Sequence, residues 1–258
     1  MNENKEFDYK KLLQGILDIG EEMLVCGAEV NRVEDSIMRM CTSYGGTRIN
    51  VFIITSNIQV TLEAPDGEII TQIRRIVRYS TNFDRLDYLN DLSRYVCQNT
   101  PNVVPLMEKF DQVMNRKMHN PVVEFIGAAL IAGGFTVFFG GNTFDGLSAS
   151  IMGILIMFME HALKKREKNE IVYFFVTSLV AGIAAIILVR IGIGINIDKI
   201  MIGGIMLLIP GIAMTNGIRD MLIGDIVSGL LRVVNSLLIA AAIACGFALA
   251  IIALGGVL

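Results

Sequence analysis

The stretch IVYFFVTSLVAGIAAIILV, residues 171–189, runs for 19 residues without a charged side chain. As an α-helix rising 1.5 Å per residue it would extend about 28 Å, close to the roughly 30 Å hydrocarbon core of a bilayer. Helices of soluble proteins usually keep one polar face toward water, and this stretch has none. It therefore predicts a transmembrane helix and places the chain among integral membrane proteins.

Four further apolar stretches of comparable length lie in the same half of the chain. They span residues 122–141, 147–163, 200–218 and 233–258. The first follows Asn120, which can cap a helix, and begins near Pro121, which suits the first helical position. Small residues four apart, which let helix backbones approach closely in lipid, occur as Ala149 and Gly153, Ser178 and Gly182, and Ala181 and Ala185. The pattern predicts an α-helical bundle of about five transmembrane helices over residues 119–258.

The first 120 residues have a different composition. They contain 14 Lys and Arg and 17 Asp and Glu, whereas the remaining residues contain 8 of each class. This contrast indicates a water-soluble domain, residues 1–118, joined to the membrane helices. The net charge of −3 provides no basic surface, so nucleic acid is not an expected partner.

The soluble domain alternates between helical and strand patterns. Apolar residues recur with helical spacing over residues 7–44, with Gly20 and Gly27 as candidate breaks between two helices. The β-branched stretch at residues 49–77 predicts two or three short strands with a turn at Pro65-Asp66-Gly67. Two further helices are predicted at residues 82–99 and 103–117. Together these elements predict a small α+β domain.

Lysine and arginine are unevenly distributed over the loops that flank the membrane stretches. Arg116 and Lys117 precede the first stretch, and four basic residues lie at 164–168, whereas the loop at residues 141–146 has none. By the positive-inside rule this distribution places the N-terminal domain in the cytosol, and five spans then place the C-terminus outside. We expect a multi-pass protein of a bacterial-type inner membrane.

The segment LLIPGIAMTNGIRDMLIGDIVSGLLR, residues 207–232, departs from a simple membrane helix. Pro210 and Gly211 interrupt the fourth stretch, where proline removes a helix hydrogen bond. The polar residues that follow are Thr215, Asn216, Arg219, Asp220, Asp225, Ser228 and Arg232. The segment fits a proline kink whose arginines reach the lipid headgroups. It fits equally a discontinuous helix whose freed backbone, Asn216 and arginines bind an anionic solute.

A second charged cluster lies in the soluble domain, in the stretch GAEVNRVEDSIMRM at residues 27–40. Its charged residues are Glu29, Arg32, Glu34, Asp35 and Arg39. On a helix, Glu29 and Arg32 are three apart, and Asp35 and Arg39 are four apart. Solvated ion pairs on one helix face are the expected arrangement.

Sequence motifs of common enzyme classes are missing. There is no Walker motif, no G-x-G-x-x-G or G-x-S-x-G sequence, and no histidine paired with a nucleophile. The four cysteines show no C-x-x-C spacing, and the two histidines are isolated. We therefore expect no enzyme activity, no cofactor and no metal site.

Four stretches together resemble the threonine/serine exporter family. They are residues 27–40, VFIITSNIQVTL at 51–62, RLDYLNDLSR at 85–94, and residues 207–232. The resemblance covers nearly the whole chain and is to the split type, whose larger (YjjP-like) subunit works with a small separate membrane protein (YjjB-like). It implies secondary efflux of threonine and serine, or of dicarboxylates such as succinate, together with such a partner subunit.

The resemblance also implies which positions carry the family motifs. In the soluble domain these are Glu29, Arg32, Glu34 and Asp35; in the membrane half they are Pro210, Gly211, Asn216, Arg219, Asp220, Asp225, Ser228 and Arg232. By their chemistry, Arg219 and Arg232 would attract a carboxylate. Asp220 or Asp225 would exchange a proton with the driving gradient, as buried carboxylates in transporters do.

Two other classes of function stay open at this point. One is a membrane-anchored sensor or regulatory subunit whose soluble domain binds a ligand. The other is a membrane-embedded enzyme, although Asp220 and Asp225 match no recognised intramembrane protease signature and no nucleophile stands beside a base.

Overall fold

The computed structural model describes residues 7–78, 80–116, 120–163, 167 and 169–254. Its contacts divide the chain into two compact units. The first comprises Met1–Met118 and Thr215–Val233, and the second comprises His119–Met214 and Val234–Leu258. Several residues used in the sequence predictions lie outside the described residues: Lys117, His119, Lys164, Lys165, Arg166, Lys168 and residues 255–258.

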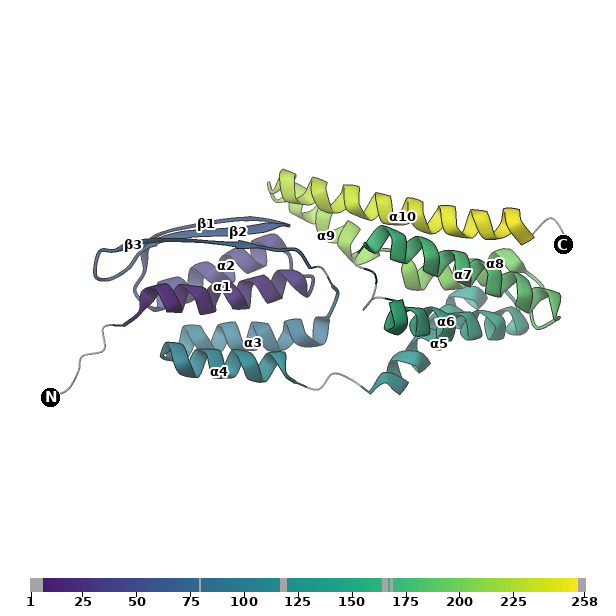
Figure 1. The fold of residues 1–258 in the computed structure, drawn as a ribbon, viewed down its shortest axis with the longest axis horizontal. Helices are drawn as coiled ribbons and strands as arrows, with labels where there is room; N and C mark the ends of the chain where they lie inside the picture. The colour runs from purple at the N-terminus through teal and green to yellow at the C-terminus, as the bar shows by residue number, and fades with distance from the viewer. Residues whose placement is uncertain (1–6, 79, 117–119, 164–166, 168, 255–258) are drawn as a thin grey trace. The chain divides into compact units, whose positions relative to one another are not determined.

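The N-terminal part of the first unit has three layers (Figure 1). Helices α1 (Tyr9–Val25) and α2 (Val30–Ser43) lie between a three-stranded sheet and the pair α3 (Phe83–Asn99) and α4 (Val103–Met114). The sheet is antiparallel, in the order β1 (Thr47–Ile54), β2 (Asn57–Glu63) and β3 (Ile69–Arg75). The predicted mixture of helices and strands is confirmed.

The elements begin and end largely for the predicted reasons. Asn82 caps α3 by accepting a hydrogen bond from the backbone N–H of Arg85 at 2.9 Å. The turn between β2 and β3 has Gly67 at φ +86°, a conformation that favours glycine. The long N-terminal helix breaks at Gly27 as predicted, but the predicted break at Gly20 is wrong. Gly20 lies inside α1, where a Cβ would be only 2.7 Å from Cδ1 of Ile37 on α2, so it is a close-packing position.

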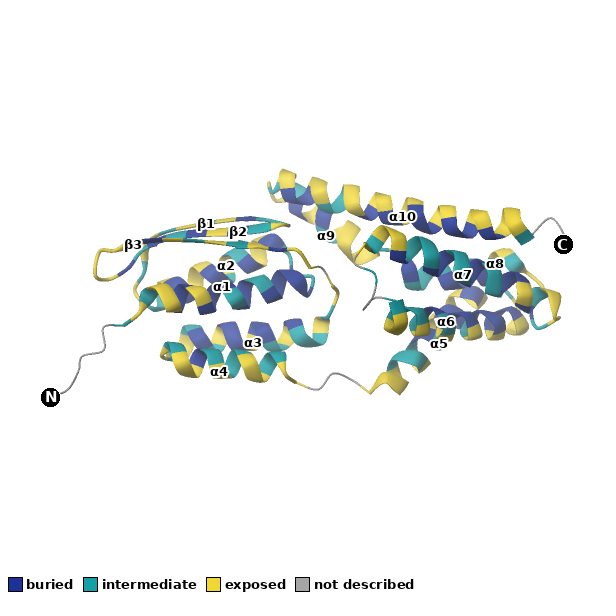
Figure 2. Ribbon diagram, viewed as in Figure 1, coloured by how far each residue is buried: buried dark blue, intermediate teal, exposed yellow. Residues whose placement is uncertain are grey.

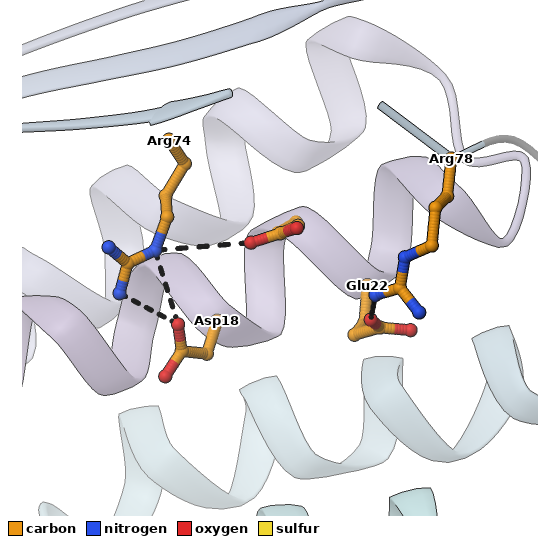
Figure 3. Close-up of polar contacts among 5 residues, drawn as sticks. Asp18, Glu22, Arg74 and Arg78 are labelled. Atoms are coloured by element: carbon orange, nitrogen blue, oxygen red, sulfur yellow. Dashed lines mark hydrogen bonds and ion pairs between the residues drawn. The ribbon is translucent and has the colours of Figure 1, made fainter. Parts of the chain in front are cut away.

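Ion pairs join β3 and the residues after it to one face of α1 (Figure 3). Arg74 lies 2.8 Å from Asp18 and 3.9 Å from Glu21, and Arg78 lies 2.8 Å from Glu22, whose side chain is buried. The other face of α1 packs into an apolar core shared with α2, the sheet and α3; its fully buried members include Leu17, Met23, Ile37, Ile58 and Leu89. These contacts fix α1 and the turn that follows it.

The second unit is a bundle of apolar helices. Among the described residues, four helices are long and apolar enough to cross a membrane: α5 (Pro121–Phe138), α6 (Thr143–Leu163), α7 (Glu170–Arg190) and α10 (Ile226–Leu254). The pair α8 (Ile197–Leu208) and α9 (Gly211–Leu222) passes the same test as one bent span, which gives four or five spans. This agrees with a bundle of about five membrane helices, with the last helix beginning earlier than residue 233.

The break in the fourth span falls at the predicted proline. Helices α8 and α9 are bent by 55°, and Ile209 and Pro210 separate them. Proline has no N–H to continue the helix ladder, and the N–H of Gly211 turns back to the carbonyl of Ile209 at 2.8 Å. The fourth stretch is therefore a discontinuous helix.

The bundle packs through small residues. A Cβ on Gly153 would lie 2.6 Å from the carbonyl oxygen of Ala128, and one on Gly182 would lie 2.7 Å from the Cβ of Ala250. Each glycine therefore permits a close approach of two helices, as its four-residue spacing predicted. Figure 2 shows a buried stripe along α10 beside an exposed one, and the exposed stripe is rich in large apolar side chains.

Candidate functional site

The candidate site joins two segments far apart in the sequence, both within the first unit. One is the turn Cys26–Glu29 between α1 and α2, called here the α1–α2 turn. The other is Thr215–Val233, which contains the end of α9 and the start of α10 and is called here the hairpin. The two segments contain eight of the candidate site residues that the sequence singled out.

The α1–α2 turn presents backbone carbonyl groups because a helix ends there. Helix termini leave carbonyls without partners in their own helix, and they need donors from elsewhere. Gly27, with φ +98°, lets the chain reverse before α2 begins. The carbonyl of Cys26 accepts a hydrogen bond from the N–H of Asn82 at 3.1 Å. The next two carbonyls, those of Gly27 and Ala28, accept hydrogen bonds from side chains of the hairpin.

Three side chains of the hairpin reach the α1–α2 turn. Nδ2 of Asn216 donates to the carbonyl of Gly27 at 3.3 Å, and Nη2 of Arg232 donates to the carbonyl of Ala28 at 2.9 Å. Nη1 of Arg219 lies 2.5 Å from Oε1 of Glu29. Three consecutive residues of the turn thus each bind a different side chain of the hairpin.

The ion pair of Glu29 corrects one sequence prediction. Among the described residues, Glu29 pairs with Arg219, 190 positions away, instead of with the neighbouring Arg32, whose side chain is exposed. Helical spacing cannot reveal this because the partner comes from a distant segment. The predicted pair of Asp35 and Arg39 is confirmed, at 2.9 Å on the exposed face of α2.

Asp220 is the most buried charged group of the hairpin. Its Oδ2 lies 3.6 Å from Nε of Arg232, and its side chain has no exposed surface. Within the part of the chain that the structure describes, neither of its oxygens has a hydrogen-bond partner. The N–H of Val30, at the positive end of α2, faces the same carboxylate without completing a hydrogen bond. Arg232 therefore compensates a buried negative charge while it holds the α1–α2 turn.

The two hairpin helices cross at glycines. A Cβ on Gly217 would lie 2.9 Å from the carbonyl oxygen of Gly229, and one on Gly229 would lie 2.8 Å from the backbone N of Met221. Real Cβ atoms do not come so close to backbone atoms, so larger residues would separate the helices. This close crossing brings Asp220 on α9 beside Arg232 on α10.

Two further contacts surround this centre. The hydroxyl of buried Ser228 donates to the carbonyl of Ile53 at the end of β1, at 3.4 Å. Burial raises the pKa of Glu34 on α2, and the nearby negative charge of Asp225 in the hairpin raises it further. The acidic motif residues of α2 and of the hairpin are therefore neighbours.

The remaining predicted residues lie elsewhere. Pro210 and Gly211 belong to the second unit, with Pro210 in the break between α8 and α9 and Gly211 as the first residue of α9. Thr215, at the start of the hairpin, is exposed, as are Arg32 and Asp35 on α2. Among the described residues there is no group of three or more His, Cys, Asp or Glu side chains placed to hold a metal ion.

Asp145 is a buried acid that the sequence analysis did not single out. Lying near the start of α6 in the second unit, it accepts hydrogen bonds from the backbone N–H groups of Asn142, Ile195 and Asn196 at 2.7–2.9 Å. The side chain of Asn196 also donates to it, at 2.8 Å. Asp145 joins the turn before α6 to the chain before α8, which is a structural role. Its place in the first turn of α6, three residues after Asn142, was the available signal.

Comparisons with known proteins agree with this architecture. The family described as "Putative threonine/serine exporter" (ThrE) matches residues 14–254. The threonine/serine exporter of Corynebacterium glutamicum is 23% identical over 249 residues, covering 90% of this chain and 49% of that protein. The chain thus spans about half the length of this relative. No solved structure matches.

Proposed function

Because the chain belongs to the threonine/serine exporter family, we propose that it is a subunit of a secondary transporter that exports threonine and serine across a bacterial-type inner membrane. The family match over residues 14–254 supports export, and the four or five apolar helices supply a membrane-spanning bundle. The Corynebacterium glutamicum relative is named a threonine/serine exporter, which supports the choice of solutes. In this proposal the N-terminal domain lies in the cytosol and the C-terminus outside.

The observation that carries the proposed site is the meeting of the hairpin with the α1–α2 turn. The side chain of Arg219 is 61% exposed, so its guanidinium donors can reach a dissolved carboxylate. All amino-acid solutes have a carboxylate, and arginine matches its two oxygens with a planar fork of N–H groups. Arg219 is therefore the proposed solute-binding residue.

Asp220 and Arg232 are proposed to couple the site to a proton gradient. A carboxylate buried without hydrogen bonds is stabilised mainly by its charged neighbour, which here is Arg232 at 3.6 Å. Protonation of Asp220 would remove that attraction and leave the hydrogen bond from Arg232 to the carbonyl of Ala28 in place. Gain and loss of one proton would thus alter how the hairpin is held.

Dicarboxylates such as succinate are a second candidate class of solute. The observation that favours them is the presence of two guanidinium groups, those of Arg219 and Arg232, within one hairpin. A second carboxylate would have to compete with Asp220 for Arg232, whose side chain is only 13% exposed. This burial makes threonine and serine the better candidates.

A partner subunit forms part of the proposal. The resemblance to the split type implies a small, YjjB-like membrane protein that acts together with this chain. The first experiment therefore measures efflux of labelled threonine, serine and succinate from preloaded cells. The cells would contain the chain alone, a four-span partner alone, or both.

We expect threonine and serine efflux from the pair, and its loss with Arg219→Ala. The matched control is Arg94→Ala on α3, which removes an arginine from an exposed ion pair with Asp91 at 3.0 Å. Efflux that needs neither the chain nor Arg219 would reject the proposal and favour an anchored sensor. Chemical change of the recovered solute would favour an enzyme.

A further inference from the structure

The contact between Glu29 and Arg219 has the chemistry of a bound solute. Glu29 is the N-cap residue of α2, yet within the described chain its side chain makes no capping hydrogen bond. Instead it places Oε1 at 2.5 Å from Nη1 of Arg219. A carboxylate supplied by the chain itself therefore occupies the guanidinium that we propose for the solute.

The exposure of the pair makes exchange possible. The side chain of Arg219 is 61% exposed and that of Glu29 is 26% exposed. Exposed ion pairs are weak because water and salt compensate for their loss. A dissolved carboxylate can approach the same guanidinium from the solvent side and replace Glu29 without the need to open a buried contact first.

The other hydrogen bonds made by the hairpin determine how firmly it is held once a solute has displaced Glu29. The hydrogen bond from Asn216 to Gly27 is long, at 3.3 Å, and that from Ser228 to Ile53 is longer, at 3.4 Å. Bonds of this length are weaker than those near 2.9 Å. With Glu29 displaced, the contacts that remain between the hairpin and the α1–α2 turn include the hydrogen bond from Arg232 to Ala28 at 2.9 Å.

We propose that Glu29 and Arg219 form a latch: Glu29 holds the hairpin closed as an internal carboxylate, and the carboxylate of the exported solute displaces it and opens the latch. The proposal rests on the proposed function, because it needs a solute that binds Arg219. The solute binds the open state more tightly, since Arg219 is free only there, and a ligand shifts an equilibrium only through such a difference in affinity.

The hairpin is well placed to pass such a change along the chain. Its helix α9 starts at Gly211, directly after the break at Pro210, and its helix α10 continues to Leu254. Both helices therefore contain residues of the second unit as well as the first. Release of the hairpin frees the ends of two helices that continue into the apolar bundle.

The first test is the concentration dependence of threonine efflux by the chain with its partner. Glu29→Gln removes the competing charge and keeps the size of the side chain, so the half-saturating threonine concentration should fall by about two- to fivefold. The matched control is Glu68→Gln, which removes an exposed glutamate from a 2.6 Å ion pair with Lys10. The control should leave the half-saturating concentration unchanged.

The second test follows the latch without measuring transport. Ser228 is 2% exposed, so a Ser228→Cys variant lacking the four native cysteines should react slowly with a maleimide. Threonine at saturating concentration should raise the labelling rate severalfold in the full-length chain in membranes. Adding Glu29→Gln should raise it without threonine, and adding Glu68→Gln should not.

The outcomes separate the latch from the transporter. Threonine efflux with an unchanged half-saturating concentration in Glu29→Gln would overturn the latch and leave the proposed function intact. Labelling of Ser228→Cys that threonine does not accelerate would also overturn it, provided that the variant still exports threonine. If the wild-type pair exports no threonine and threonine accelerates no labelling, both the proposed function and the latch are wrong.

Discussion

Arg232 and Asp220 form an ion pair in which the carboxylate is completely buried and lies 3.6 Å from Nε of the guanidinium. The two residues come from different helices of the hairpin, and the same guanidinium donates to the carbonyl of Ala28 through Nη2. One side chain therefore stabilises the inside of the hairpin and binds the hairpin to the α1–α2 turn. Loss of Arg232 would therefore remove both contacts at once.

Removal of Arg232 should be strongly destabilising. Arg232→Ala leaves the charge of Asp220 buried without its partner, which costs about 3–5 kcal/mol in comparable pairs. Asp220→Asn in the same chain removes that charge and should recover part of the loss. The measurement is a double-mutant cycle on the thermal unfolding of the purified chain in detergent. Additive effects of the two substitutions would show that the pair is not coupled.

Because α9 and α10 cross closely at glycines, two Gly→Ala substitutions should differ in their effect on stability. Gly229→Ala would place a Cβ 2.8 Å from the backbone N of Met221 and should cost about 1–3 kcal/mol through overpacking. Gly127→Ala in α5 is the control, because no described heavy atom lies within 4 Å of its added Cβ. It should be neutral or slightly stabilising, since alanine favours helix. Equal unfolding temperatures for the two variants would contradict the observed crossing.

The raised pKa of Glu34 predicts that a substitution at this position changes the stability of the chain in a pH-dependent way. Burial and the nearby Asp225 raise its pKa in the folded chain, so the protonated form is favoured there. Its contribution to stability is then complete below the unfolded pKa and is lost as the pH rises through the folded value. Glu34→Gln should therefore be more stable relative to wild type at pH 7 than at pH 4. Thermal unfolding at both pH values measures this, with Glu108→Gln on the exposed face of α4 as the control. A pH-independent difference would contradict the raised pKa.

Substitution of Asp145, which belongs to the second unit and not to the proposed site, should lower the stability of the chain. Asp145→Asn replaces an acceptor by an N–H donor that faces other donors, so several hydrogen bonds to a charged group are lost. Such bonds contribute about 1.5–3 kcal/mol each, and the unfolding temperature should fall by many degrees. Asp198→Asn is the matched control because its carboxylate is 64% exposed, in an ion pair with Lys199. If both variants unfold alike, the hydrogen bonds of Asp145 do not contribute to stability.

Much of the fold follows from local sequence patterns. The apolar stretches predicted the membrane helices, and Pro210 predicted the break between α8 and α9, because both depend on chemistry within one segment. The break at Gly27 was predicted as well, whereas Gly20 was misjudged. Gly20 has no side chain because Ile37 packs closely against it, and not because the chain turns there. The sequence alone cannot distinguish these two roles of a glycine, since the distinction depends on where the second helix lies.

The residues of the site could be predicted from the sequence, but the contacts between them could not. Glu29 and Arg219 were both singled out, but their pairing depends on how residues 190 positions apart meet. The backbone acceptors at Gly27 and Ala28 have no signature in the residue types, because every residue has a carbonyl. Helical spacing favoured Arg32 as the partner of Glu29, and tertiary contact overrode it.

The most direct test of the account is exchange of threonine in vesicles that contain the purified chain together with its small membrane partner. The vesicles are loaded with labelled threonine, unlabelled serine is added outside, and the label that appears outside is identified chemically. We predict unchanged threonine outside the vesicles, with at least a tenfold lower rate for Arg219→Ala than for Arg94→Ala. Threonine retained in the vesicles would contradict the proposed export, and equal rates for the two variants would contradict the proposed site.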